Sequence, residues 1–121
     1  MKLVFVYKSS SGKLKAIWDS AHKLFSPATY PCSLCALTFG IFSERNVWKE
    51  FRKRTSVEMV FLHQNEFNKQ YPNELHRKVQ FPIIYKEVND ALATFISSET
   101  LQNFKKTEDL ISAIEARLLR H

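Results

Sequence analysis

The chain contains few cysteines and no long apolar run, and each absence excludes a class of protein. Only two of its 121 residues are cysteine, so no disulfide framework supports the fold and stability has to come from buried apolar side chains. No segment approaches the roughly 20 apolar residues that a membrane span requires. The apolar run at residues 3–7 is too short for a signal peptide, and no small-residue cleavage site follows it. We therefore expect a cytoplasmic protein with no membrane association.

Internal repeats, low-complexity tracts and linkers are also missing. The length predicts one domain spanning residues 1–121. The composition, 45% hydrophobic and 25% charged, is typical of globular proteins. Ten phenylalanines, four tyrosines and two tryptophans supply bulky side chains for a core.

The charge balance is basic, with a formal net charge of +6 and a pI near 9.4, which raises the question of nucleic-acid binding. The densest basic cluster comprises Lys49 and residues 52–54, on a predicted helix whose other face carries Val47, Trp48 and Phe51. This pattern is typical of a solvated helical face. None of the usual nucleic-acid recognition motifs is present, so we do not expect a nucleic-acid partner.

Apolar periodicity and turn signals predict alternating strands and helices. The predicted strands span residues 3–7, 57–63, 79–85 and 91–96, and the last two form a hairpin. Helices are predicted at 13–25, at 36–42 (opened by Pro31 and Cys32), at 44–53 (capped by Ser43) and at 66–71, with a helical turn through Phe104. A final helix, capped by Thr107, is predicted to bury Leu110, Ile111, Ile114, Leu118 and Leu119. The first two strands should be parallel, because helices connect them, and the hairpin antiparallel. We therefore predict an α/β domain with a mixed β-sheet flanked by helices on both faces.

The two cysteines stand two residues apart, in the run Cys32-Ser33-Leu34-Cys35. Two thiols at this spacing can close a disulfide when the first lies at a helix N-terminus, where free N–H groups also stabilise a thiolate. They can equally supply half of a tetrahedral metal site, or fill a core, because free cysteine is among the most buried residue types. A C-x-x-C in a reducing compartment is more often catalytic or metal-binding than a structural bridge. All three interpretations remain open at this point.

A zinc site at the cysteines needs two further ligands, and His22 and His63 are the candidates. No second C-x-x-C and no H-x-x-x-H accompanies them. His22 lies beside the apolar stripe of its predicted helix and His63 ends a predicted strand, places where hydrogen-bonded or capping histidines are more common than ligands. We therefore predict no metal ligands and no cofactor, with a zinc-binding module as an alternative.

Residues 9–13, between a predicted strand and a predicted helix, present serines, a glycine and a lysine that could hold an anion on backbone N–H groups. The nucleotide-binding pattern G-x-x-x-x-G-K-[ST] is not met, because Leu14 stands where the hydroxyl residue belongs. We do not expect a nucleotide triphosphatase.

The order of elements and two motifs resemble the thioredoxin-like superfamily, which includes thioredoxins and glutaredoxins. The motifs are residues 31–35 running into a helix, and residues 81–84, which start the proline-led strand before the closing hairpin and helix. The resemblance covers roughly residues 30–118. It implies that Cys32 is the nucleophile, that Cys35 is the resolving thiol, and that Phe81 and Pro82 form the backbone ledge that binds substrate. It also implies that Pro82 follows a cis peptide close to the cysteines.

Two features depart from that family pattern. The predicted helix at 13–25 intervenes between the first strand and Cys32, which indicates an insertion or a different α/β sandwich. The dipeptide Ser33-Leu34 is not among the commonest between the cysteines of the family's redox enzymes. The runs Tyr-Pro-Cys-x-Leu-Cys and Asp-Ser-Ala-His are also similar to those of small, uncharacterised bacterial proteins, a likeness that implies no activity.

These observations lead to the hypothesis of a thiol-disulfide oxidoreductase or redox-sensing domain, whose partner is a protein or low-molecular-weight thiol or disulfide. A zinc-binding module and a non-enzymatic domain are the alternatives. In the redox case Cys32 Sγ should be more exposed and more acidic than Cys35 Sγ. The reason is that the first residue of a helix-opening pair faces free N–H groups, while the following turn covers the second.

Overall fold

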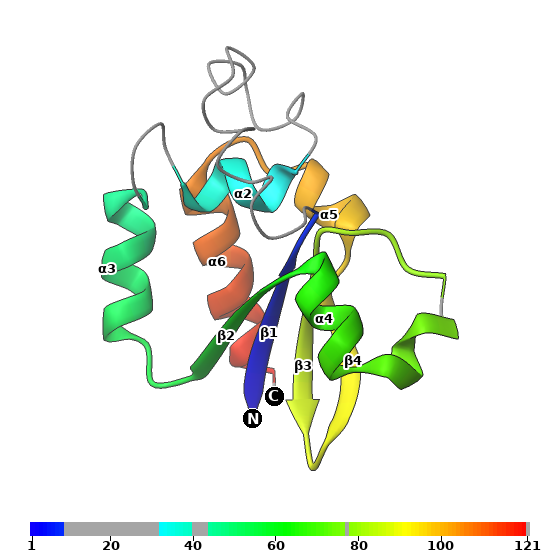
Figure 1. Ribbon diagram of the computed structural model, residues 1–121. Coiled ribbons are helices and arrows are strands. Elements are labelled where there is room, and N and C mark those ends of the chain that lie inside the picture. Colours follow the sequence, from blue (N-terminus) through cyan, green and yellow to red (C-terminus); the bar gives the residue numbers. More distant parts are fainter. Residues whose placement is uncertain (9–31, 40–43, 77, 121) are drawn as a thin grey trace.

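The computed structural model describes residues 1–8, 32–39, 44–76 and 78–120 (Figure 1). The predicted helix at 13–25, the serine-rich segment at 9–13, His22 and Ser43 lie outside the described residues.

The described strands form one mixed sheet in the order β2-β1-β3-β4. These strands are β1 (Lys2–Tyr7), β2 (Glu58–His63), β3 (Ile83–Val88) and β4 (Ala91–Ile96). Strand β1 pairs parallel with β2 and antiparallel with β3, and β3 pairs antiparallel with β4. The parallel pair and the hairpin are therefore confirmed.

The turn between β3 and β4 consists of Asn89 and Asp90, whose φ angles are 53° and 66°. Asparagine and aspartate tolerate this left-handed region better than most residues, and two such residues in a row suit a tight hairpin turn. Strand β3 begins four residues later than predicted, directly after Pro82. Proline has no N–H to donate to a ladder, so it stands at the start of the strand rather than within it.

The helices of the described residues are short, and none combines the length and the apolar character that a membrane crossing requires. They are α2 (Ser33–Thr38), α3 (Asn46–Arg54), α4 (Gln64–Gln70), the 3-10 helix η3 (Pro72–His76), α5 (Ser98–Gln102) and α6 (Thr107–Leu118). Ser97 caps α5, since its Oγ accepts the Thr100 N–H at 3.2 Å.

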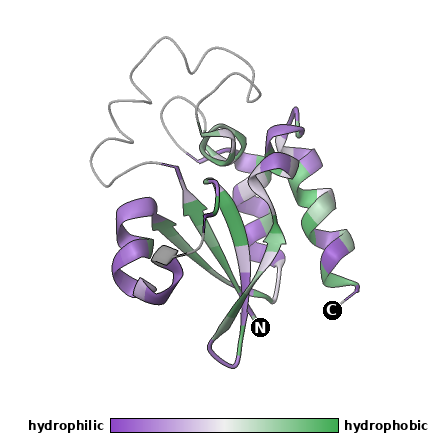
Figure 2. Cartoon of the chain, turned by 90° about the vertical axis from the view of Figure 1, so that its right-hand side faces the viewer, coloured by the Kyte–Doolittle hydropathy of each residue, from purple (hydrophilic) through white to green (hydrophobic). Residues whose placement is uncertain are grey.

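Helices cover both faces of the sheet, as predicted (Figures 1 and 2). Side chains of a strand alternate between faces. Accordingly Leu3, Phe5 and Tyr7 of β1 join a core cluster with α2, α3, α5 and α6. Val4 and Val6 point the other way and pack in a second cluster with α4. Strand β1 is thus buried on both faces, which explains its unbroken apolar sequence.

Helix α3 differs from the prediction in its start and in its buried face. It begins at Asn46, because Glu44 is used in an isolated antiparallel bridge with Phe39. Glu44 also forms an ion pair with Arg52, so this arginine is not part of a purely solvated basic face. Val47 is 45% exposed, whereas Trp48 belongs to the core.

Helix α6 differs in its cap. We predicted that Thr107 caps the helix, but its hydroxyl instead donates to the Leu37 carbonyl at 2.6 Å. Asp109 Oδ2 accepts the N–H groups of Lys105 and Lys106, which secures the first turn from within the helix. Leu119, predicted to be buried, is 89% exposed because α6 ends before it.

Candidate functional site

Cys32 and Cys35 are joined in a disulfide, and their Cα atoms lie 5.3 Å apart. Cys32 is the N-cap of α2, and its Sγ accepts the backbone N–H of Cys35 at 3.3 Å. The Ala36 N–H donates to the Cys32 carbonyl at 3.1 Å, which closes the first helical turn. The pair therefore opens a helix, as predicted.

The burial of the two cysteines differs from the expectation. We expected Cys32 to be more exposed than Cys35, but Cys32 is fully buried and Cys35 is 1% exposed. Both residues belong to the core cluster shared by α2, α5 and α6. The physical reason is that α2 lies against the core along its length, so its first turn is covered as well as its second.

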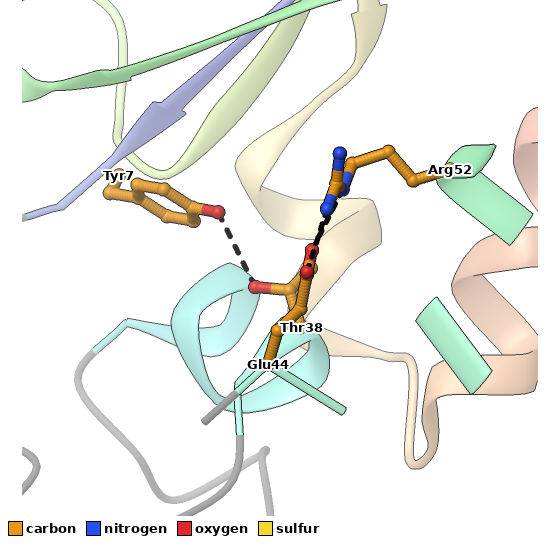
Figure 3. Close-up of polar contacts among 4 residues, drawn as sticks. All are labelled: Tyr7, Thr38, Glu44 and Arg52. Atoms are coloured by element: carbon orange, nitrogen blue, oxygen red, sulfur yellow. Dashed lines mark hydrogen bonds and ion pairs between the residues drawn. The ribbon is translucent and has the colours of Figure 1, made fainter. Parts of the chain in front are cut away.

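Three hydroxyl groups, those of Thr38, Tyr7 and Thr107, form hydrogen bonds in the C-terminal half of α2. Thr38 Oγ1 donates to the Leu34 carbonyl at 2.9 Å. Because that bond uses the only threonine hydroxyl proton, the Tyr7 hydroxyl is the donor in its 3.4 Å contact with Thr38 Oγ1 (Figure 3). Burial raises the pKa of Tyr7 above its ordinary value, so the phenol remains a neutral donor at physiological pH. The Thr107 hydroxyl adds the bond to Leu37.

Pro82 is buried and follows a cis peptide bond, as predicted. It directly precedes Ile83, which pairs with Val6 near the carboxyl end of β1. The Tyr7 hydroxyl contacts Thr38 of α2 at that same end, so Pro82 and the disulfide helix lie at the same end of the strands. The half-buried Phe81 ring packs on Phe67 of α4, with ring centroids 5.9 Å apart, on the face away from the cysteines. The role of Phe81 and Pro82 as a backbone ledge that binds substrate stays a prediction.

The described residues contain no group of three or more His, Cys, Asp or Glu side chains that could hold a metal ion. They therefore offer no ligand set for the zinc-binding alternative. His63 ends β2 as predicted, and its backbone N–H donates to Glu66 Oε1 at 2.8 Å at the start of α4. In the disulfide form neither sulfur is a thiolate, the form that binds zinc.

The residues that position α2 were not among the predicted site residues. Thr107 and Leu37 are 70 residues apart in the chain, and no local pattern links them. Tyr7 was predicted only as the end of a strand. The sequence signal for this role is a tyrosine at the end of an apolar strand. Its hydroxyl, once buried, needs a hydrogen-bond partner elsewhere in the fold.

Comparisons with protein-family models, with curated proteins and with solved structures find no match to this chain.

Proposed function

We propose that this domain carries a reversible dithiol–disulfide centre at Cys32 and Cys35, and that it serves as a redox-sensing domain or thiol-disulfide oxidoreductase of thioredoxin-like type. The observation that carries the proposal is a disulfide at C-x-x-C spacing whose first cysteine caps a helix. The order of elements supports the thioredoxin-like assignment: a strand, the disulfide helix, a parallel strand, then a proline-led hairpin and a closing helix.

The chemistry follows from the roles of the two sulfurs. A Cys32 thiolate attacks a substrate disulfide, the substrate S–S bond breaks, and one half leaves as a thiolate that takes up a proton. The thiolate of Cys35 then attacks Cys32 Sγ in the mixed disulfide, which closes the internal disulfide and releases the second half as a thiol. Two electrons pass from protein to substrate, and two equivalents of an external thiol, which become its disulfide, restore the dithiol.

The Cys35 N–H contact favours Cys32 as the attacking sulfur. A hydrogen bond to the charged form of an acid stabilises that form, so this N–H lowers the free energy of a Cys32 thiolate. The described structure contains no corresponding N–H donor to the Cys35 sulfur.

The burial of both cysteines limits the classes of redox partner that can reach them. A buried sulfur exchanges only when the structure around it opens locally, and a small thiol or disulfide needs a smaller opening than a folded protein. This favours a sensor that equilibrates with low-molecular-weight thiols over an enzyme that acts on folded proteins.

Trapping of a mixed disulfide tests the proposal. After incubation with bis(2-hydroxyethyl) disulfide, Cys35→Ser should retain a mercaptoethanol adduct at Cys32, detected by intact mass and peptide mapping. The matched variant Cys32→Ser should form far less adduct, and the wild type should form none because Cys35 releases it. Equal adduct formation at both cysteines, or none in either variant, would contradict the assigned roles. One equivalent of zinc in the freshly purified wild type would instead favour the zinc-binding alternative.

A further inference from the structure

A cavity of about 490 Å³ lies at the carboxyl ends of the parallel strands β1 and β2. Tyr7 and His63, the last residues of these strands, contribute to its wall together with Phe61. The carboxyl ends of parallel strands are a frequent place for ligands in α/β proteins. A volume of this size lies within the usual range for small-molecule pockets. No function assigned above uses this cavity.

The aromatic rings of Tyr7, Phe39 and Phe61 contribute to the cavity wall, together with the His63 imidazole. The Tyr7 ring centroid lies 6.3 Å from that of Phe39, at an interplanar angle of 68°, and 6.5 Å from that of Phe61, at 17°. Rings in both edge and stacked orientations favour an aromatic guest, because offset stacking and edge contacts add to area burial.

The charged groups Glu44, Arg52 and Glu66 of the wall already have partners. Arg52 donates to Glu44 through both Nε, at 2.9 Å, and Nη2, at 2.8 Å (Figure 3). Glu66 accepts the His63 backbone N–H at 2.8 Å and lies in the first turn of α4, where an acidic side chain is stabilised. A ligand with a net charge would have to compete with these pairs. The wall is therefore complementary to an uncharged molecule.

Part of this wall belongs to the disulfide helix. Phe39 is the C-cap of α2, and its N–H donates to the Cys35 carbonyl at 2.9 Å. Glu44 is held against Phe39 by the isolated β-bridge. The Arg45 N–H extends this link by donating to the Thr38 carbonyl at 2.8 Å. The positions of Phe39 and Glu44 thus depend on the conformation of α2.

We propose that this cavity binds a small uncharged aromatic molecule, and that it binds more tightly when the Cys32–Cys35 disulfide is closed. The inference rests on the proposed function in one respect, which is that the disulfide opens reversibly in the folded protein. A six-residue helix has little stability of its own, so opening the disulfide loosens α2. A ligand that binds the reduced protein must then order this part of the wall, which lowers its affinity. Linkage makes the effect reciprocal, and a tenfold difference in affinity equals a change of about 30 mV in the disulfide potential.

A titration with indole, followed by amide NMR of the full chain, tests the proposal. In the oxidised protein, indole should shift the amide signals of Phe39, Glu44 and His63. Its Kd should be about tenfold higher after reduction with dithiothreitol, which becomes a cyclic disulfide as the protein gains two thiols. Phe39→Leu should weaken binding several-fold, whereas the matched variant Phe104→Leu, outside the cavity, should not. Benzoate and benzylamine should bind more weakly than indole.

The outcomes separate the two proposals. Equal indole affinity in both redox states, with two free thiols confirmed by mass, overturns this inference and leaves the proposed function standing. Benzoate or benzylamine binding as tightly as indole also overturns it. If reduction unfolds the protein, the proposed function and this inference fail together, because the inference requires a folded dithiol form.

Discussion

At the residue scale, single buried hydroxyl groups hold the disulfide helix on the core. Tyr7 donates to Thr38, and Thr38 donates to the Leu34 carbonyl, so each hydroxyl proton has one acceptor. A buried hydroxyl without a partner is costly. The chain of donors therefore helps to position α2, whereas burial raises the pKa of Tyr7 and keeps its phenol protonated.

Replacing Tyr7 with phenylalanine should change how stability depends on pH. An unfolded tyrosine titrates near pH 10, whereas burial raises the pKa of Tyr7 in the folded state. Above pH 10 the unfolded chain loses this proton while the folded protein keeps it. The free energy of unfolding contributed by Tyr7 is therefore complete below pH 10 and falls at higher pH, by at most about 1.4 kcal/mol per pH unit.

Urea unfolding of wild type and Tyr7→Phe from pH 8 to 11 measures this effect. At pH 8 the variant should be less stable by about 1 kcal/mol, because it lacks the bond to Thr38. The difference should shrink as the pH rises above 10. Tyr71→Phe, at a half-buried position, should show a smaller change in slope. A difference between wild type and Tyr7→Phe that stays constant with pH would contradict this account of Tyr7.

The acidity of the two thiols is a second prediction at this scale. In the reduced protein, iodoacetamide should modify Cys32 before Cys35, because the Cys35 N–H contact stabilises a Cys32 thiolate. Peptide mapping over a pH series measures both rates, and Cys32→Ser reports the rate of Cys35 alone. The reverse order, or equal rates at every pH, would show that Cys32 is not the more acidic thiol.

At the scale of elements, α2 is placed by contacts from distant parts of the chain rather than by its own sequence. The Leu37 carbonyl of α2 accepts a hydrogen bond from the Thr107 hydroxyl of α6, and Thr38, the last residue of α2, accepts one from the Tyr7 hydroxyl of β1. Apolar alternation and the turn at residues 89–90 were sufficient to predict the strands and the hairpin, because those signals are local. The start of α3 and the role of Thr107 were predicted wrongly, because tertiary partners of Glu44 and Thr107 replaced the local caps.

The same distinction applies to the candidate site. The C-x-x-C spacing and the position of Pro82 could be predicted, since both are sequence motifs. The burial of Cys32 could not, because it depends on how α2 packs against α5 and α6. The cavity could not be predicted either, because its wall combines strand ends with a helix cap that are far apart in the chain.

Thr107→Val should loosen the packing of α2 against α6. The substitution keeps the shape of the side chain but leaves the buried Leu37 carbonyl without this donor, and should lower the free energy of unfolding by about 1–3 kcal/mol. Urea unfolding measures the change. Thr94→Val, at an exposed position of β4, is the matched control and should stay within about 0.5 kcal/mol of wild type. A Thr107→Val protein as stable as its control would show that this bond contributes little.

At the scale of the whole molecule, the basic composition raises the question of a nucleic-acid partner, and helix α3 carries the densest basic cluster. Lys49, Lys53 and Arg54 are exposed on α3, whereas Arg52 is engaged by Glu44. Arg54 also lies over the Phe51 ring, 5.2 Å from its centroid. Three exposed cations on one short helix make few phosphate contacts, so the basic pI does not by itself imply a nucleic-acid partner.

We accordingly expect only weak binding to DNA or RNA. A few phosphate contacts give an affinity that falls steeply with salt. Fluorescence anisotropy with a labelled 20-base-pair duplex should detect binding at about 20 mM salt and none at about 150 mM salt. Binding that survives the higher salt concentration would identify a nucleic-acid interface that this account lacks.

The central claim is that Cys32 and Cys35 interconvert between dithiol and disulfide within the folded protein. Its most direct test is equilibration of the full chain in buffers of reduced and oxidised dithiothreitol, followed by acid quenching, maleimide labelling and intact mass, with circular dichroism recorded on parallel samples. We predict one two-electron transition between species with zero and two labels, with a native circular dichroism spectrum at both ends. Reduction that occurs only together with loss of the native spectrum, or thiols that never pair under oxidising conditions, would contradict the claim.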